Sequence, residues 1–254
     1  MIKKIFTLTI TTVRELIREK FFVVGIVTAG LLVALSYLLG KLSFLEQLRI
    51  LFNIGTLGIE LVLLGIGLFA SSSLINREIE LRTCQIVLTR PVSRSTFLIG
   101  KWLGLTFFQS ITGLILSLVL YFLAIDEFSS RSFVFINIQI LLKTLVLMSV
   151  SFFMGLSLRP VLASLIGVCV YLLGHAIESI EFLVRNPETK ENPLWFQFFA
   201  KVVPRFDHYN WKSFYFIENG ISSESFVLML THYLSWILIL LTLSLLVWRR
   251  KDIG

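Results

Sequence analysis

The chain has 254 residues, of which 56% are hydrophobic and only 15% are charged. Soluble domains carry about 45–50% apolar and about 25% charged residues, so this composition excludes an ordinary soluble domain. The two cysteines, Cys84 and Cys169, fall in a polar loop and an apolar segment, which excludes a disulfide framework or cysteine-based redox chemistry. The net charge of +7 does not indicate nucleic-acid binding, because the aromatic residues lie within apolar segments.

Six segments are long and apolar enough to cross a bilayer, whose hydrocarbon core takes about 20 helical residues. They are residues 21–40, 54–75, 102–125, 138–158, 160–180 and 226–248. The first lacks the small-residue cleavage site of a signal peptide, so we expect a retained anchor. The predicted fold class is an all-α polytopic membrane protein, with residues 1–254 in a single transmembrane domain.

Lysine and arginine positions predict the orientation of these spans, because cytoplasmic loops are enriched in both residues. One side carries fourteen of them: Lys3, Lys4, Arg14, Arg18, Lys20, Arg77, Arg82, Arg90, Arg94, Lys101, Arg159, Arg249, Arg250 and Lys251. The opposite short loops carry three: Lys41, Arg49 and Arg131. We therefore expect a multi-pass protein of the cell (inner) membrane with both termini in the cytoplasm.

Residues 1–20 combine apolar positions at helical spacing with basic side chains near the first span. This pattern is typical of an amphipathic helix in the cytoplasmic interface, where basic side chains face anionic lipid. We expect such an elbow helix here. A short cytoplasmic extension of the first span is the alternative.

A charged loop, residues 76–97, separates the second and third predicted spans. Its first part mixes charged and apolar residues as one or two helical turns do, and Pro91 ends that helix because proline disfavours helical backbone in the preceding residue. Ser93 is expected to cap the next helix. A short helix of this kind could dock on a cytoplasmic partner, and a solvated connection is the alternative.

The same loop resembles that of a known family. The residues are Asn76-Arg77-Glu78-Ile79-Glu80, Thr83, Leu88-Thr89-Arg90-Pro91-Val92-Ser93-Arg94, Phe97 and Gly100-Lys101. They are similar to the signature loop of exporter-type (ABC-2) ABC-transporter permeases, above all those of nitrous-oxide reductase maturation and gliding motility. Weaker similarity lies in Glu15-Leu16-Ile17-Arg18 with Lys20 and in Val203-Pro204-Arg205-Phe206-Asp207.

This resemblance implies a six-span permease that forms a homodimer and binds two ATP-binding subunits, which hold ATP and magnesium. The loop would be a coupling helix seated in the ATPase. The residues so assigned to coupling are Arg77, Glu78, Glu80, Arg82, Thr83, Arg90, Pro91 and Arg94, with Glu15 and Arg18 in the elbow helix. The chain has no Gly-x-x-x-x-Gly-Lys-Ser/Thr sequence, so we expect no ATPase site or cofactor of its own.

Residues 181–225 form a long segment rich in tryptophan, phenylalanine and tyrosine. Such residues favour the membrane interface, so we expect short helices on the outer leaflet, broken at Pro187, Pro193 and Pro204. This segment could gate an exit path or bind an outer partner. A purely structural cap over the dimer is the alternative.

Ionisable groups inside spans are candidate pathway residues, because each costs roughly 2.5–3.5 kcal/mol in hydrocarbon. They are Glu60, Lys143, His175 and Glu178, with Gln109 as a further polar group. We expect Glu60 and Lys143 to extend towards the outer interface, and His175 and Glu178, three residues apart, to form a hydrogen-bonded pair. The alternative for His175 and Glu178 is a proton relay or a metal site. Two ligands without a third are weak evidence for a metal, so we predict no metal site.

Small residues in the second predicted span favour close helix approach, and we expect the second and fifth spans to line the dimer seam. Close packing within one subunit is the alternative. We predict that the chain is a permease that couples ATP hydrolysis by another subunit to export of a lipidic or amphipathic substrate. We expect that the chain itself is not an enzyme. The alternatives are an ion-coupled secondary transporter, a permease that does mechanical work on an outer partner, and a membrane-embedded hydrolase using His175 and Glu178.

Overall fold

The computed structural model describes residues 2–18, scattered positions between 23 and 38, and residues 47–80, 93–123, 130–185, 193–206 and 223–250. Every regular element in these ranges is a helix. The helices are α1 (Ile2–Arg18), α3 (Gln47–Glu80), α5 (Arg94–Leu123), α6 (Ser130–Gly155), α7 (Pro160–Val184), α8 (Leu194–Val202) and α9 (Ser223–Arg250). Five of them, α3, α5, α6, α7 and α9, are long and apolar enough to cross a membrane. The fold is that of a helical multi-pass membrane protein.

Five of the six predicted spans correspond to these five helices. The remaining one, residues 21–40, lies largely outside the described residues. The described positions within it are helical, and Gly25 lies against Ile66 of α3. Several helices run further than the apolar segments predict, and α3 extends the predicted span at both ends. Helical hydrogen bonding does not stop where the hydrocarbon stops, so a hydropathy pattern marks the spanning part and not the whole helix.

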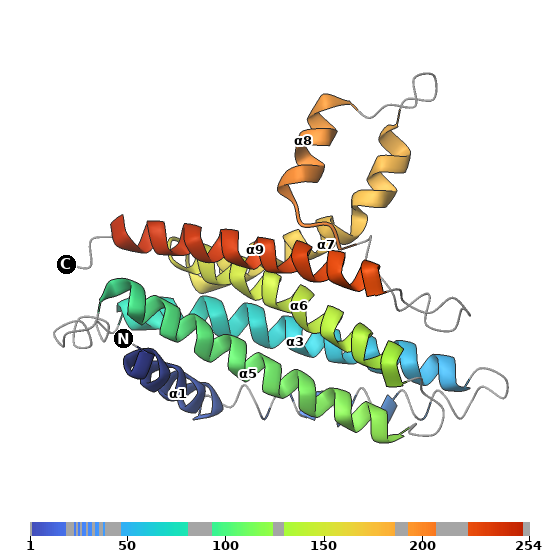
Figure 1. Ribbon diagram of the computed structural model, residues 1–254, viewed down its shortest axis with the longest axis horizontal. Coiled ribbons are helices and arrows are strands. Elements are labelled where there is room, and N and C mark those ends of the chain that lie inside the picture. The colour runs from blue at the N-terminus through green and yellow to red at the C-terminus, as the bar shows by residue number, and fades with distance from the viewer. Residues whose placement is uncertain are drawn as a thin grey trace.

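The long helices lie side by side along one axis (Figure 1). Helix α6 is at the centre, since it contacts α3, α5, α7 and α9, and it is the most deeply buried of the five spans. Helices α7 and α9 expose most of their apolar surface, as Val161 and Leu238 illustrate. In a membrane protein such surface faces lipid, which replaces water as the solvent of the apolar side chains.

Some of the small residues of α3 pack within the subunit. Gly55 lies against Leu120 of α5, and the backbone of Ser72 lies against Gly155 of α6. These contacts match the within-subunit alternative for the second predicted span. A role of the fifth predicted span in a dimer seam stays a prediction.

Helix α1 packs on α5 near the end of the bundle where α9 ends (Figure 1). The contact is close because α5 has glycines one turn apart, Gly100 and Gly104. A Cβ atom at either position would lie 2.6 Å from the Cβ of Leu8 or of Thr12, respectively. This small-x-x-x-small spacing lets two helix backbones approach. Residues 2–18 are helical, and the elbow helix in a lipid interface stays a prediction.

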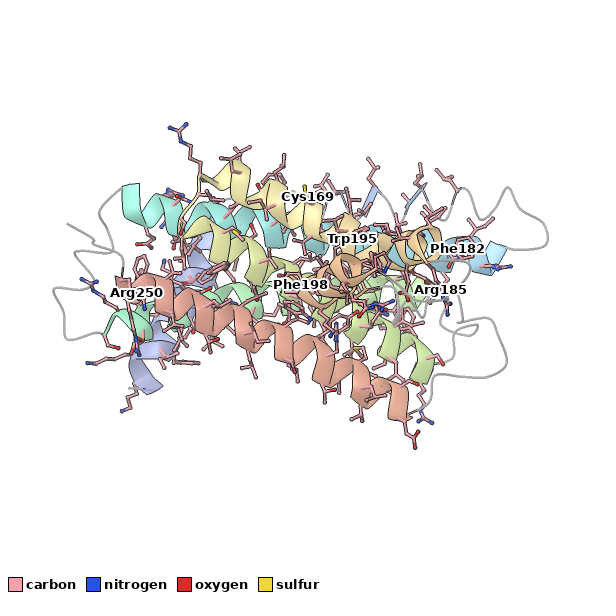
Figure 2. The ribbon with its side chains drawn as sticks, turned by 90° about the horizontal axis from the view of Figure 1, so that it is seen from above. Cys169, Phe182, Arg185, Trp195, Phe198 and Arg250 are labelled. Carbon is pink, nitrogen blue, oxygen red and sulfur yellow. The ribbon has the colours of Figure 1, made fainter. Side chains whose placement is uncertain are left out.

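The end of α7 turns away from the bundle, and α8 runs back alongside it (Figure 1). Helix α8 lies between Pro193 and Pro204, two of the predicted breaks. The N–H of Phe206 then donates to the carbonyl of Gly174, 3.1 Å away, which returns the chain to α7. Figure 2 shows the apolar side chains Phe182, Trp195 and Phe198 on this unit, and all three are exposed. Residues 186–192 and 207–222 of the predicted outer segment lie outside the described residues.

Candidate functional site

Helix α5 begins directly after the loop that carries the family resemblance. The N–H of Thr96 donates to the hydroxyl oxygen of Ser93 over 3.2 Å, so Ser93 caps the helix as predicted. This bond satisfies one of the backbone donors that a helix start leaves without an intrahelical partner. The position where α5 begins is therefore fixed by a local interaction.

Two turns into α5, Lys101 joins three helices. Its Nζ lies 2.9 Å from a carboxylate oxygen of Glu15 on α1 and forms a second ion pair with Glu78 on α3. The Lys101 side chain is 6% exposed, that of Glu78 12% and that of Glu15 35%. The two carboxylates compensate the charge of this buried ammonium group. Without them, Lys101 would carry a buried charge with no partner, which is strongly destabilising. We call these three residues the Lys101 cluster.

The Lys101 cluster links the two helices on either side of the predicted coupling loop. Glu78 lies two residues before the end of α3, and Lys101 lies in the first turns of α5. The ion pair between them therefore links the two helices that enter and leave residues 81–92. Because Glu15 joins the same ammonium group, α1 is attached to this junction as well.

Asn76 anchors the same end of α3 to the turn between α6 and α7. Its Nδ2 group donates to the carbonyls of Gly155 at 2.9 Å and Leu158 at 3.0 Å, and to Ser72 on its own helix at 3.0 Å. The last carbonyls of a helix have no intrahelical donor, so this side chain satisfies groups that would otherwise be unpaired. The end of α3 is thus connected to α5, α1 and α6.

The structure describes part of the predicted coupling set. Arg77, Arg94 and the elbow residue Arg18 are exposed, and Glu80 is the last residue of α3. Four residues assigned to coupling lie outside the described residues: Arg82, Thr83, Arg90 and Pro91. The elbow residue Glu15 and the coupling residue Glu78 are brought together by Lys101, which the coupling set did not contain.

A second charged group lies inside the bundle. Glu60 of α3 and Lys143 of α6 form an ion pair, and their side chains are 4% and 1% exposed. The hydroxyl of Tyr171 on α7 donates to Glu60 over 3.1 Å, and Lys143 Nζ lies 3.3 Å from His175 Nε2. We call these four residues the Glu60 cluster. The Glu60 cluster joins α3, α6 and α7. The carboxylate of Glu60 and the ammonium group of Lys143 neutralise each other.

The contacts of His175 define its tautomer. A lysine ammonium group can only donate, so Nε2 of His175 accepts from Lys143. Nδ1 lies 3.0 Å from the carbonyl oxygen of Tyr171, which can only accept. The arrangement fits a neutral imidazole with its proton on Nδ1. Neutral histidine leaves the cluster with one cation and one anion.

Two expectations for these residues are wrong. Glu60 and Lys143 do not extend towards an interface, because their side chains are 4% and 1% exposed and pair with each other between α3 and α6. His175 does not pair with Glu178, whose side chain is exposed. The three-residue spacing puts them near each other on α7, but His175 faces Lys143.

Gln109, the other polar residue noted in the spans, lies between α5 and α3. It is 1% exposed, and its Nε2 group donates to the carbonyl of Leu63 over 3.2 Å. Gly67 provides the space for it, because a Cβ atom there would lie 3.1 Å from the Gln109 amide. Gln109 therefore serves helix packing and is separate from the Glu60 cluster.

Sequence reasoning missed the roles of two cluster residues, Lys101 and Tyr171, and of Asn76. Lys101 is part of the resembling motif and of the basic residues that predict orientation, but the sequence assigns it no partner, although the glycines at 100 and 104 signal a close helix contact. Asn76 was part of the resembling motif but had no role. For Tyr171 no signal was present, since its partner Glu60 is remote in sequence.

No family model matches the chain, and a search of curated proteins finds no match. The class that the fold and the two clusters define is a helical multi-pass membrane protein with buried charged junctions between its helices.

Proposed function

We propose that this chain is the membrane-spanning permease subunit of an ATP-driven exporter of the ABC-2 class. In this proposal it pairs with a second copy and with two ATP-binding subunits on the cytoplasmic side, where both termini lie. The sequence support is the resemblance at residues 76–101. The structural observation that carries the proposal is the Lys101 cluster at the base of the same segment.

A segment that transmits movement from an ATPase needs ends that move with the transmembrane helices. If the ends were loose, the loop would absorb the movement itself. The ion pair of Lys101 with Glu78 joins the two ends, and Glu15 adds α1 to the same junction. Displacement of residues 81–92 would therefore shift α1, α3 and α5 together, a rigid-body motion of the kind that drives many transport steps.

Asn76 extends this connection to the rest of the bundle. Through its bonds to Gly155 and Leu158, movement at the end of α3 is passed to the turn between α6 and α7. The mechanism we propose is alternating rearrangement: closure of the ATP-binding subunits moves the loop, and the seam between two copies opens outwards. The energy comes from the partner subunit.

The proposal is tested by affinity purification of the tagged chain from its native membranes, followed by mass spectrometry and ATP-hydrolysis assays. We expect a stoichiometric ATP-binding subunit to co-purify. Arg90→Glu in the loop is expected to release this subunit, and Arg131→Glu, the same charge reversal on the opposite predicted side, is expected to retain it. Purification of the chain without an ATP-binding subunit contradicts the proposal.

A second candidate function is ion-coupled transport, which the Glu60 cluster favours. Ionisable residues buried between membrane helices are common in proton relays. The purified chain in liposomes with an internal pH dye separates the two functions. A permease without its ATPase is expected to leave an imposed pH gradient intact, whereas dissipation of the gradient that Glu60→Gln abolishes would support the ion-coupled transporter.

A further inference from the structure

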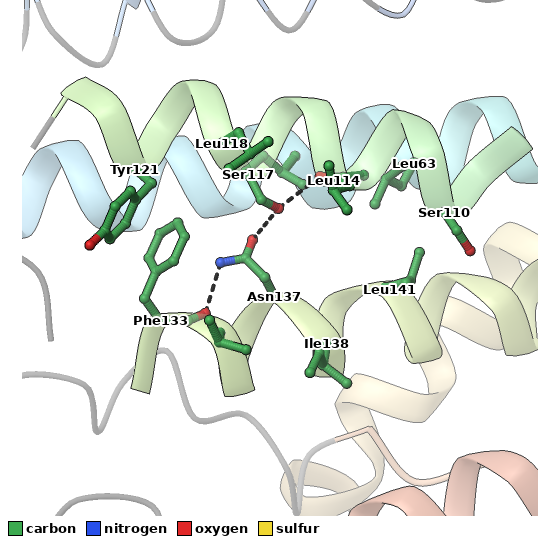
Figure 3. Close-up of a pocket in the computed structure, with 13 residues that line it drawn as sticks. Leu63, Ser110, Leu114, Ser117, Leu118, Tyr121, Phe133, Asn137, Ile138 and Leu141 are labelled. Carbon is green, nitrogen blue, oxygen red and sulfur yellow. Dashed lines mark hydrogen bonds between the residues drawn. The ribbon is translucent and has the colours of Figure 1, made fainter. Parts of the chain in front are cut away.

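Two apolar grooves follow helix α5. The α5–α6 groove lies between these helices over a floor of α3 and has a volume of about 540 Å³ (Figure 3). The α1–α5 groove lies where α1 crosses α5 and has a volume of about 730 Å³. Both volumes fall within the roughly 300–1,000 Å³ that is usual for ligand sites.

The two grooves meet at Ser110, which lines both of them. The α5 residues that line the α1–α5 groove are Leu103, Thr106, Phe107 and Ser110. Those that line the α5–α6 groove are Ser110, Gly113, Leu114, Ser117, Leu118 and Tyr121. All these positions repeat at three or four residues and so lie on one face of α5. The two grooves therefore lie end to end along one face of α5, and we call them together the α5 track.

The wall of the α5 track is apolar with a few polar groups at intervals. Exposed apolar side chains such as Phe6 and Phe107 line the α1–α5 groove. In the α5–α6 groove, Ser117 Oγ lies 2.7 Å from Asn137 Oδ1, so this polar pair crosses between the helices (Figure 3). Polar side chains inside membrane spans are costly and point to function by default.

The α1–α5 groove also has a basic residue. Arg14 of α1 lines it and is exposed. A guanidinium group matches the geometry and charge of a phosphate, and it attracts an anionic lipid headgroup. The apolar side chains beside it match acyl chains. One molecule with both parts is a phospholipid with a negatively charged headgroup.

Hydroxyl groups continue from there along the track. Thr106 and Ser110 each donate to a carbonyl one turn earlier, at 2.9 and 2.8 Å, which leaves their oxygen lone pairs as acceptors. Headgroups with hydroxyl or amine donors can bind such acceptors. The hydroxyl of Ser110 lies where the grooves meet, so the junction is polar in an otherwise apolar wall.

We propose that the α5 track binds an anionic phospholipid and that this lipid is the substrate of the exporter. The phosphate lies at Arg14, the acyl chains lie along the apolar wall, and Ser110 is the junction through which the headgroup passes between the two grooves. The substrate assignment rests on the proposed function, whereas lipid binding in the track does not.

Photolabelling tests the binding. Membrane vesicles that contain the full chain are supplied with phosphatidylglycerol that carries a diazirine on one acyl chain, and labelled peptides are mapped by mass spectrometry. We expect labels concentrated on the track residues of α1, α5 and α6. Equal labelling of the exposed faces of α7 and α9 overturns the proposal. Unlabelled grooves in a chain that cross-links as a dimer overturn it too, because a second copy then covers them.

Two variants sharpen this test. Arg14→Gln is expected to reduce phosphatidylglycerol labelling of the α1–α5 groove about fivefold and to leave phosphatidylcholine labelling unchanged. The reason is that a basic residue at a membrane surface contributes about 1 kcal/mol to the binding of anionic lipid.

Ser110→Phe is expected to remove labels on either side of the junction at Ser110. Its control is Val119→Phe, an exposed α5 position on the opposite side of the helix that lines neither groove. An unchanged pattern in both Arg14→Gln and Ser110→Phe overturns the proposal, and the wild-type pattern decides if Ser110→Phe does not fold.

The substrate assignment has its own measurement. In the complex isolated from native membranes, we expect phosphatidylglycerol to stimulate ATP hydrolysis and Ser110→Phe to remove this stimulation. Labelling needs neither ATP nor an ATP-binding subunit. Labelled grooves in a chain without such a subunit would therefore refute the proposed function alone, and uniform labelling of a chain that binds one would refute the lipid track alone.

Discussion

Lys143 of α6 and Glu60 of α3 form an ion pair that is buried between three helices, with side chains 1% and 4% exposed. Burial of two charges is costly, and the cost is offset only while each charge has its partner. Tyr171 and His175 complete the hydrogen bonds of this pair from α7. The stability of the bundle therefore depends on the charge balance of the Glu60 cluster.

Lys143→Met is expected to destabilise the protein by roughly 3–5 kcal/mol, because it leaves the Glu60 carboxylate buried without its cation. The double variant Glu60→Gln with Lys143→Met is expected to recover most of this loss, since it removes both charges and keeps an acceptor for Tyr171. Unfolding in mixed detergent micelles measures both. Lys201→Met, at an exposed position of α8, is the control, and a double variant as unstable as Lys143→Met would contradict the argument.

The two ion pairs of Lys101 are expected to differ in strength. Glu78 is more buried than Glu15, so water screens its attraction to Lys101 less. Double-mutant cycles with Lys101→Met are expected to give a coupling energy of about 2 kcal/mol with Glu78→Gln and below about 1 kcal/mol with Glu15→Gln. High salt is expected to weaken the Glu15 coupling more. Equal couplings would show that the burial difference has no energetic effect.

Gly104→Val is expected to loosen α1 from α5. A Cβ atom at this position would lie 2.6 Å from Thr12 Cβ and 3.1 Å from the backbone oxygen of Thr9, so the helices have to separate. Hydrogen exchange of the α1 amides is expected to increase, because local opening sets this rate. Gly65→Val is the matched control, since nothing lies within 4 Å of a Cβ atom there. Unchanged exchange in Gly104→Val would contradict the close approach.

Asn76→Ala is expected to cost about 1–3 kcal/mol, because the carbonyls of Gly155 and Leu158 lose their side-chain donor. Asn76→Asp is expected to cost more, since a carboxylate places an acceptor against these acceptors. Asn53→Ala, at an exposed position of the same helix, is the control and is expected to have little effect. Thermal unfolding in detergent compares the three variants, and similar values for Asn76→Ala and Asn53→Ala would contradict the capping role.

The sequence predicts five of the spans well because a helix that crosses a bilayer must be long and apolar, and such a segment is visible in the sequence. It predicts Ser93 as a cap because capping is a local interaction between residues three apart. It does not predict how far each helix continues, because helix ends depend on polar turns outside the hydrocarbon, which hydropathy does not describe. It also does not predict that Glu60 and Lys143 face each other inside the bundle.

The charged clusters could not be predicted, because their members come from different helices. Lys101 and Glu15 are 86 positions apart, and Tyr171 and Glu60 are 111 apart. Which of them meet depends on how each helix is rotated in the bundle, a property that a single sequence does not contain. The glycines at 100 and 104 are a partial exception, since their spacing signals a close helix contact without saying which helix makes it.

The central claim is that the loop between α3 and α5 contacts a separate ATP-binding subunit. Cys84, within that loop, allows a direct test: the Cys169→Ser variant carries a benzophenone maleimide on Cys84 only and is photolysed in native membranes. We predict cross-linking to an ATP-binding protein, and none from Cys169 in the Cys84→Ser variant, because that residue is exposed on a predicted membrane span. Cross-linking from Cys84 to lipid or to other proteins, but not to an ATP-binding one, would contradict the account.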